Sequence, residues 1–393
     1  MAYRTYDVIL AGGGIMGCAT AYYLVRTDPT LRVAIVEKDP TYARASTPLC
    51  DGNIRVQFNV KENILMSLYG LEVLARFSEE MVVGGEKPEV AFHRQGNIFL
   101  VNEEGRQTAQ EGLSLQKALG CQVEWFSPDQ FMRRYPLLNL TSCAGGTLGY
   151  QDGTMDPFAV LMGYKRKAVE LGANFIHAEV GKLSQDRRQI TGVKLTSGDV
   201  LNSNFVVNTA GAWAASLADP LGIALPVQPT KRQVFVLETH ARMDGLLPAI
   251  IFPSGLYLIH ERAGRFTCGK SLPDDLMSYD DFEWDRERFS QILWPELVEY
   301  VPDFDRLKVA RGWAGLYEVN MLDGNAILGE WPELKGFFLA NGFSGHGFQQ
   351  CHAVGRYLSE LILHRPISLD LSIFSPNRIL ENRPVYEGKH KLV

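Results

Sequence analysis

A glycine-rich corner near the start of the chain constrains the fold more than any other segment. The sequence DVILAGGGIMGCATAYYLV spans residues 7–25 of 393. The apolar run over 6–11 predicts a strand buried on both faces, and the apolar residues of 15–24 recur at helical spacing. A second apolar run over 31–39 ends in acidic residues. Strand, glycine turn, helix and strand in this order predict a βαβ unit with a right-handed crossover.

Three glycines of this corner, Gly12, Gly14 and Gly17, satisfy the pattern G-x-G-x-x-G. The first glycine suits a tight turn, the second lets the backbone approach a pyrophosphate, and the third allows close helix–strand packing. The N-terminus of the helix offers free N–H groups and a partial positive charge to phosphates. Glu37 ends the second strand, where a carboxylate accepts hydrogen bonds from ribose hydroxyls. The corner therefore predicts a dinucleotide site rather than an αβ turn without a ligand.

Glycine corners of this kind bind both FAD and NAD, so the choice between the two cofactors depends on the rest of the chain. After Glu37 the alternating strand–helix pattern stops at a polar loop over 46–53, and residues 61–82 and 105–119 are expected to form helices. Alternating runs bounded by turn residues then predict an antiparallel, mixed sheet with helices inside it. The runs lie in 94–101, 144–153, 177–211, 233–238 and 256–270, and the helices in 157–170 and 283–299. Such a second domain favours FAD, whose extended form reaches beyond the first domain.

A second strand, glycine turn and helix follow near the other end of the chain. The sequence GFFLANGFSGHGF covers residues 336–348, and a helix is expected over about 349–363. Because the two glycine turns lie so far apart, we expect the first domain to be discontinuous. The chain would leave it for the mixed sheet and return close to the C-terminus. We find no internal repeat of fixed period.

The net charge and the cysteines limit which classes of protein the chain can belong to. The net charge is −6, with no basic tail, which argues against nucleic acid or an anionic membrane as a partner. The six cysteines form no CxxC and no zinc-ligand spacing, so we expect a reducing compartment and no structural metal. The N-terminus lacks the pattern of a signal peptide, and no run of about 18 apolar residues predicts a membrane span. We therefore expect a cytoplasmic enzyme.

Several motifs occur in order along the chain: DVILAGGGIMGCATAYYL, VEKD, ARAST, VVNTAGAWAASLA (206–218), GWAGLYEVNMLDGNAILGE (312–330) and ANGFSGHGFQQCHAVGRYLSELI (340–362). With them the chain resembles the FAD-dependent D-amino-acid oxidase superfamily over about residues 5–375. The resemblance is to the branch of sarcosine oxidases, glycine oxidase and dimethylglycine-type dehydrogenases. Within that branch the chain is most similar to the sarcosine oxidase β-subunit and to FAD-dependent oxidoreductase-domain proteins.

The resemblance implies an α/β fold of the glutathione-reductase type, with a Rossmann-like FAD-binding domain and an α+β substrate domain. It places the discontinuous FAD-binding domain in residues 1–85, 145–220 and 325–375. The substrate-binding domain, built on the mixed sheet, is expected in 86–144 and 221–324. Residues 376–393 are expected to form a C-terminal tail.

The same resemblance implies which residues surround the cofactor. Gly12, Gly14 and Gly17 would hold the pyrophosphate and Glu37 the adenosine ribose, with Ile15, Met16 and Lys38 as further cofactor-binding residues. Ser46 and Thr47 would lie near the pyrophosphate or isoalloxazine, and Val180 would contact the adenine. Ala210, Gly211 and Trp213 would lie beside the ribityl chain and pyrophosphate, and Gly342, Gly345, His346, Gly347 and Phe348 along the pyrimidine side of the flavin. Backbone N–H groups and a helix N-terminus in the last segment would stabilise the anionic reduced ring. His346 either fills the turn or gives electrostatic help to the reduced flavin.

On the substrate side, the resemblance places a carboxylate-binding arginine at Arg55 and a substrate-contacting tyrosine at Tyr257. A guanidinium fork grips a carboxylate bidentately and fixes which C–H bond faces the flavin. The alternatives are a structural ion pair for Arg55 and a buried sheet position for Tyr257. Trp313 and Tyr317 either shape the pocket or belong to the core.

The chain departs from the family pattern at four places. Gln349 stands where sarcosine oxidase has a second carboxylate-binding lysine, and Gly315 stands where some members attach flavin through a cysteine. No histidine occurs in 40–59, so we expect FAD to be bound non-covalently. The oxygen-activating lysine has no clear counterpart, with Phe266 near its place and Lys270 four residues on, which leaves the electron acceptor open.

We therefore expect an FAD-dependent amine or amino-acid oxidase or dehydrogenase. A neutral amine held by its carboxylate would lose hydride to flavin N5, and the imine would hydrolyse in water. The resemblance favours a secondary amine and allows either a homo-oligomer or a partner subunit. Two alternatives are C–O oxidation of a 2-hydroxy acid or glycerol phosphate, and a non-catalytic flavoprotein subunit or assembly factor.

Overall fold

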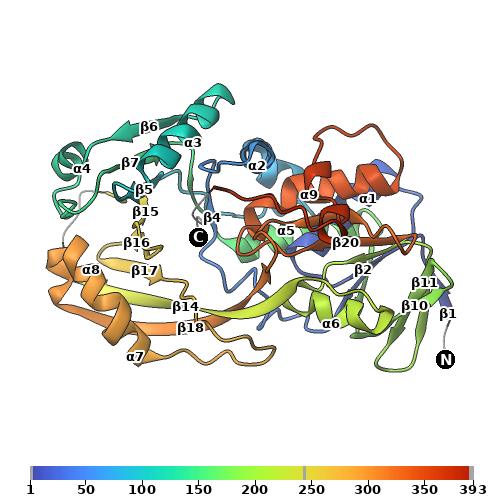
Figure 1. Ribbon diagram of the computed structural model, residues 1–393. Coiled ribbons are helices and arrows are strands. Elements are labelled where there is room, and N and C mark those ends of the chain that lie inside the picture. Colours follow the sequence, from blue (N-terminus) through green and yellow to red (C-terminus); the bar gives the residue numbers. More distant parts are fainter. Residues whose placement is uncertain (1–2, 242–244, 389–393) are drawn as a thin grey trace.

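The computed structural model describes residues 3–241 and 245–388 of the chain (Figure 1). Its central element is a six-stranded sheet in the order β19-β20-β13-β2-β3-β9. Neighbouring strands are parallel from β20 to β9, and β19 pairs antiparallel at the edge. The strands are β2 (Val8–Ala11), β3 (Val33–Glu37), β9 (Asn174–His177), β13 (Val206–Asn208), β19 (Ile327–Glu330) and β20 (Phe337–Asn341).

Strand β2 is buried on both faces, as its apolar sequence predicted. Val8 and Leu10 belong to a core shared with helices, whereas Ile9 and Ala11 belong to a second core on the opposite face. The predicted helices on the first face are confirmed, with ends within a few residues of the expected ones. They are α1 (Ile15–Thr27), α2 (Lys61–Glu80), α5 (Pro157–Glu170) and α9 (Gly347–Ile362).

Helices α1 and α9 lie side by side over the sheet (Figure 1). A methyl group at Gly355 of α9 would lie only 2.9 Å from the carbonyl carbon of Ala19 in α1. Small residues therefore allow the backbones of the two helices to approach. This contact brings together the helices that follow the two glycine turns at opposite ends of the chain.

The second face of the six-stranded sheet is covered by a four-stranded sheet in the order β1-β12-β11-β10. Its apolar side chains, such as Leu183, Val193 and Leu201, pack against Ile9 and Val36. The strands are β1 (Tyr3–Thr5), β10 (Val180–Asp186), β11 (Gln189–Leu195) and β12 (Val200–Asn202). A short antiparallel pair, β4 (Asn53–Ile54) with β8 (Gly153–Thr154), lies elsewhere.

The predicted mixed sheet is confirmed in part as an eight-stranded sheet in the order β18-β14-β17-β16-β15-β5-β7-β6. The run over 177–211 was wrongly included, because its strands β10, β11 and β12 lie in the four-stranded sheet and β9 and β13 belong to the six-stranded sheet. Only β15 and β5 pair in parallel, and the other neighbours are antiparallel. The strands are β5 (Asn97–Val101), β6 (Val123–Phe126), β7 (Gly145–Gly149), β14 (Val227–Thr239), β15 (Ala249–Ile251), β16 (Tyr257–Arg262), β17 (Arg265–Gly269) and β18 (Leu307–Asn320). The helices of this half are α3 (Arg106–Ala118), α4 (Pro128–Arg134), α7 (Arg286–Arg288) and α8 (Trp294–Tyr300), with a π-helical turn over 289–293.

Strand β18 was not predicted from the sequence, and β14 is about twice as long as the run over 233–238. The two strands pair from Val227 opposite Asn320 to Thr239 opposite Leu307. Gly312 and Gly315 interrupt the alternation of β18, because glycine weakens a strand pattern without preventing pairing. The long ribbon joins the two large sheets (Figure 1), and its β18 end carries residues into the site described below.

The division into domains stays a prediction, which the sheets help to refine. Residues 145–149 form β7 of the eight-stranded sheet, although we expected 145–220 in the FAD-binding part. We therefore propose a boundary after residue 149. The expected tail contains helix α10 (Asn377–Leu380), whose Arg378 is buried. Residues 1–2, 242–244 and 389–393 of the predicted domains lie outside the described residues. Within the described part, no helix is long and apolar enough to cross a membrane.

Candidate FAD site

A cavity of about 470 Å³ runs along the carboxyl ends of the central parallel strands. This is the edge where doubly wound sheets bind nucleotides. Its lining comes from the glycine corner, the end of β3, the loop after residue 43, β10, the turn after β13, β18 and the start of α9. The predicted cofactor residues that line it are Gly12, Gly14, Ile15, Met16, Glu37, Lys38, Ser46, Thr47, Val180, Ala210, Gly211, Trp213, Gly345, Gly347 and Phe348.

The three corner glycines differ in which atoms a side chain introduced at each position would contact. At Gly12, with φ of +120°, a Cβ would lie 2.3 Å from the Thr209 carbonyl oxygen. At Gly17 it would lie 2.0 Å from the Gly12 carbonyl oxygen, so Gly17 packs the helix against the turn and does not line the cavity. At Gly14 a Cβ would have no described atom within 4 Å, because it faces the open cavity. This exposed backbone fits a pyrophosphate at the N-terminus of α1.

Glu37 is held in place at one end of the cavity. Its Oε2 accepts a hydrogen bond from the Gly13 N–H, and its Oε1 accepts one from the Asp39 N–H, both at 2.8 Å. A carboxylate has about four lone-pair sites, so acceptor capacity remains for ribose hydroxyls. Nearby, the Lys38 ammonium lies 3.7 Å from the centre of the Trp213 ring, and both residues line the cavity.

Two predicted cofactor residues of the second glycine turn lie beside the cavity lining rather than in it. Gly342, with φ of +72°, donates its N–H to Glu318 Oε2 at 3.1 Å. His346 is buried and meets the ring of Phe58 edge-on at 5.2 Å. Gly347 and Phe348, in the first turn of α9, do line the cavity. The helix N-terminus therefore faces the space where the resemblance places the flavin.

Tyr317 lines the cavity, which agrees with one of the two alternatives given for it. Among the lining residues that sequence reasoning gave no role are Cys50 and Glu318. Burial raises the pKa of the Glu318 carboxyl to about 8, so it is mostly protonated at neutral pH. Burial also raises the pKa of the Cys50 thiol to about 12. Glu318 follows Tyr317 inside the motif that carried the resemblance, which is the signal that marks this position.

The loop before Asp51 is fixed to β18 by two hydrogen bonds. The Ser46 hydroxyl donates to the Leu316 carbonyl at 2.7 Å, and the Trp313 indole N–H donates to the Leu49 carbonyl at 2.8 Å. Trp313 therefore holds the loop, whereas Tyr317 lines the cavity. Gly315 faces Leu49, whose Cβ would lie 3.2 Å from an added Cβ.

Arg55 lies next to His346, outside the lining of the FAD cavity. Its NH2 nitrogen is 2.9 Å from His346 Nε2, and its guanidinium lies over the rings of Phe58 and Phe99 at 4.8 and 5.1 Å. Its backbone N–H donates to Gln349 Oε1 at 2.8 Å. Burial lowers the pKa of Arg55, and nearby carboxyl groups act in the opposite direction.

Those carboxyl groups belong to Glu387 and Asp152. Glu387 accepts hydrogen bonds from the backbone N–H groups of Asn59 and Val60, at 2.5 and 3.1 Å. Asp152 accepts one from the Val56 N–H at 2.9 Å and one from Gln57 Nε2 at 2.8 Å. The segment around Arg55 is therefore anchored on both sides.

Tyr257, the other predicted substrate residue, lines a second and smaller cavity together with Lys270. The two cavities share Ser46, Cys50 and Tyr317. Tyr257 is therefore close to the part of the FAD cavity that Ser46, Cys50 and Tyr317 line, although it does not share a cavity with Arg55.

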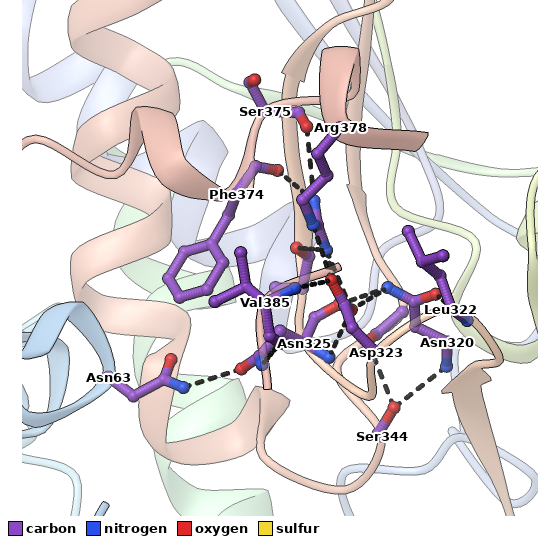
Figure 2. A network of polar contacts seen from close by, with 12 residues as sticks. Asn63, Asn320, Leu322, Asp323, Asn325, Ser344, Phe374, Ser375, Arg378 and Val385 are labelled. Carbon is purple, nitrogen blue, oxygen red and sulfur yellow. Dashed lines mark hydrogen bonds and ion pairs between the residues drawn. The ribbon is translucent and has the colours of Figure 1, made fainter. Parts of the chain in front are cut away.

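The turn after β18 is held by a buried polar network (Figure 2). Arg378 Nε donates to Asp323 Oδ2 at 2.9 Å, and Asn320 Nδ2 donates to Asp323 Oδ1 at 2.8 Å. The Asn320 N–H donates to the Ser344 hydroxyl at 2.9 Å, which connects the network to the second glycine turn. A segment near the C-terminus thereby supports the second glycine turn, from which Gly345 and Gly347 line the cavity.

Comparisons with known proteins agree with this geometry. The model of a family described as FAD dependent oxidoreductase matches residues 7–361. FAD-dependent oxidoreductase domain-containing protein 1 of Xenopus laevis is 35% identical, covering 97% of this chain and 84% of that protein. Sarcosine oxidase subunit beta of Arthrobacter sp is 26% identical, covering 93% and 91%.

A crystal structure of L-proline dehydrogenase from P. horikoshii matches the fold with a TM-score of 0.86 at 26% identity, covering 98% of this chain and 100% of that one. The predicted fold class and the choice of FAD over NAD are therefore confirmed. The chain belongs to the family of FAD-dependent oxidoreductases.

Proposed function

We propose that this oxidoreductase acts on the C–N bond of an amino acid, with a secondary amine as the preferred group. The observation that carries the proposal is the position of Arg55, a part-buried guanidinium beside His346, whose chain neighbours Gly345 and Gly347 line the FAD cavity. A cation of this kind suits a carboxylate. Sarcosine and proline, which name two of the similar proteins, are both carboxylic acids with a secondary amine nitrogen.

In this mechanism Arg55 binds the substrate carboxylate and thereby fixes which C–H bond faces the ring. The bound FAD supplies the acceptor for the hydride that leaves this carbon. His346 accepts a hydrogen bond from Arg55 and orients the guanidinium, and Tyr257 contributes a hydroxyl from the adjoining cavity. Phe58 and Phe99 cover the guanidinium and keep water from it.

The amine must be neutral before hydride can leave the adjacent carbon, because an ammonium has no lone pair to stabilise the developing imine. Activity is therefore expected to rise with pH. The imine product then hydrolyses in water.

The test is anaerobic bleaching of the yellow protein by a panel of N-methyl amino acids, primary amino acids, 2-hydroxy acids and glycerol phosphate. Bleaching by N-methyl amino acids supports the proposal. Bleaching by hydroxy acids or glycerol phosphate alone overturns it in favour of C–O oxidation. Absence of bleaching by every compound favours a subunit or assembly factor that uses FAD as structure.

We also propose that FAD is held non-covalently. Gly315 stands where the resemblance places the flavin-linking cysteine of some members, and Cys50 in the cavity carries a thiol rather than a thiolate. Precipitation with acid should release all the yellow colour into the supernatant. The electron acceptor, the cytoplasmic location and the oligomeric or partner subunits remain predictions.

A further inference from the structure

The smaller cavity is called here the Asp51 pocket. It is lined by Ser46, Leu49, Cys50, Asp51, Arg232, Gln233, Val234, Tyr257, Lys270, Ser271, Gly315, Leu316 and Tyr317. It adjoins the flavin end of the FAD cavity, with which it shares three residues. Its volume of about 40 Å³ holds about three water-sized groups. A small nitrogen substituent fits this space.

The two cations of the Asp51 pocket already have anionic partners. Arg232 forms an ion pair with Asp275, and Lys270 forms one with Glu296 at 2.5 Å. Asp51 differs from them. Its Oδ1 is buried and has no hydrogen-bond partner among the residues that the structure describes. A buried carboxylate oxygen without a partner loses much of its solvation, so a donor from a bound molecule would stabilise it.

We propose that Asp51 is a catalytic residue that binds the substrate nitrogen and takes a proton from its ammonium form. An N–H bond of the ammonium breaks, an O–H bond forms on Asp51, and the electron pair stays on the nitrogen as the lone pair of a neutral amine. The proton on Asp51 returns to water after turnover. This inference rests on the proposed function, to which it adds the group that prepares the amine.

The surroundings of Asp51 suit this role. Burial raises the pKa of the Asp51 carboxyl to about 6, and the hydroxyls of Tyr257 and Thr267 act in the opposite direction. A base of this kind is ionised at neutral pH and still accepts a proton. Other groups facing the carboxyl are Cys50, Glu261, Cys268 and Tyr317, besides the paired Arg232 and Lys270. Burial raises the pKa values of the two cysteines and of Tyr317 well above their ordinary values, so these groups stay neutral.

The first test compares wild type with Asp51→Asn and Asp51→Glu in anaerobic flavin reduction by an N-methyl amino acid across pH 5–9. The wild-type rate constant should rise to a plateau above about pH 6. Asp51→Asn should lose at least about 100-fold at pH 7, which is the lower range for general-base catalysis. Its rate should then climb about tenfold per pH unit, because only the neutral amine reacts. Asp51→Glu should recover part of the plateau.

Asp303→Asn makes the same chemical change on the exposed surface and serves as the matched control. Flavin content and the far-ultraviolet spectrum show whether each variant is folded. A rate and pH profile of Asp51→Asn within twofold of wild type would overturn the inference. Failure of wild type to be bleached by any amine would instead overturn the proposed function.

A second test uses wild type alone and does not depend on a variant folding. Trimethylglycine carries a fixed positive charge on nitrogen, whereas propionate has a carboxylate and no nitrogen. Both should perturb the visible spectrum of the flavin on binding. Trimethylglycine should bind more weakly below pH 6, where Asp51 becomes neutral, and propionate more tightly. Identical pH trends for the two carboxylates would contradict a charged Asp51 beside the substrate nitrogen.

Discussion

The NH2 nitrogen of Arg55 lies 2.9 Å from Nε2 of His346, although 291 residues separate the two in the chain. A guanidinium has only N–H donors, so Nε2 accepts and the ring proton of His346 is on Nδ1. The predicted substrate arginine is thereby oriented by the glycine turn before α9, whose neighbouring residues line the FAD cavity.

Replacing Arg55 should separate substrate binding from flavin binding. Arg55→Ala should raise KM for an amino-acid substrate about 30-fold or more, because truncating a buried charge partner costs about 2 kcal/mol or more. Arg55→Lys keeps the charge but loses the two-pronged guanidinium, so its KM should lie between those of wild type and Arg55→Ala. The flavin should remain bound in both variants. Steady-state kinetics with a flavin absorbance check tests this, and unchanged kinetics would remove Arg55 from the site.

The corner glycines allow a matched pair of variants. In Gly14→Val the new side chain points into the open cavity, so the fold should persist while FAD affinity falls at least tenfold. In Gly17→Ala the new Cβ meets the Gly12 backbone oxygen, so the fold itself should lose about 1–3 kcal/mol. Thermal unfolding and FAD titration of both variants would show the two effects. Equal loss of stability in both would contradict the assignment.

Glu318 should make stability depend on pH. Burial raises its pKa to about 8 in the folded state from an ordinary value of 4.5, so the folded state retains a proton between these values. The free energy of unfolding should therefore fall as pH rises through this window. Glu318→Gln removes this contribution and keeps a carbonyl that accepts from the Gly342 N–H. Urea unfolding of flavin-free protein at pH 5 and 7.5 measures the difference.

A suitable control for that experiment is Glu333→Gln, which makes the same change at an exposed position. It should reproduce the wild-type dependence on pH. If Glu318→Gln also reproduced it, the carboxyl would not carry the extra proton.

The C-terminal network should contribute strongly to stability. Arg378 is paired with Asp323, with exposed side-chain fractions of 5% and 0%, and also donates to backbone carbonyls (Figure 2). Arg378→Ala should lower the free energy of unfolding by about 3–5 kcal/mol, because a buried carboxylate loses its partner. Arg306→Ala, at an exposed position, should change it by less than about 0.5 kcal/mol. Chemical denaturation tests both, and equal small effects would contradict a structural role for the pair.

The site residues that could be predicted from the sequence are those whose role depends on a short, local sequence pattern. Gly12, Gly14 and Glu37 could be found because each backbone or side-chain role belongs to a single βαβ unit. Strand β18 was missed because Gly312 and Gly315 interrupt its alternation, and the cavity position of Glu318 was missed with it. Asp51 was missed because its loop has no regular pattern and its importance arises from burial.

The sequence by itself determined that this chain has a nucleotide corner, a mixed-sheet second part and a return to the first part near its C-terminus. Periodicity and glycine spacing are local properties, and they survive in any fold that contains these segments. Only the tertiary structure decided that Arg55 meets His346, that Tyr257 lies with Asp51 in an adjoining pocket, and that Arg378 supports the far end of β18. These contacts join residues far apart in the chain, and burial changes the protonation of Asp51 and Glu318, so no local pattern contains them.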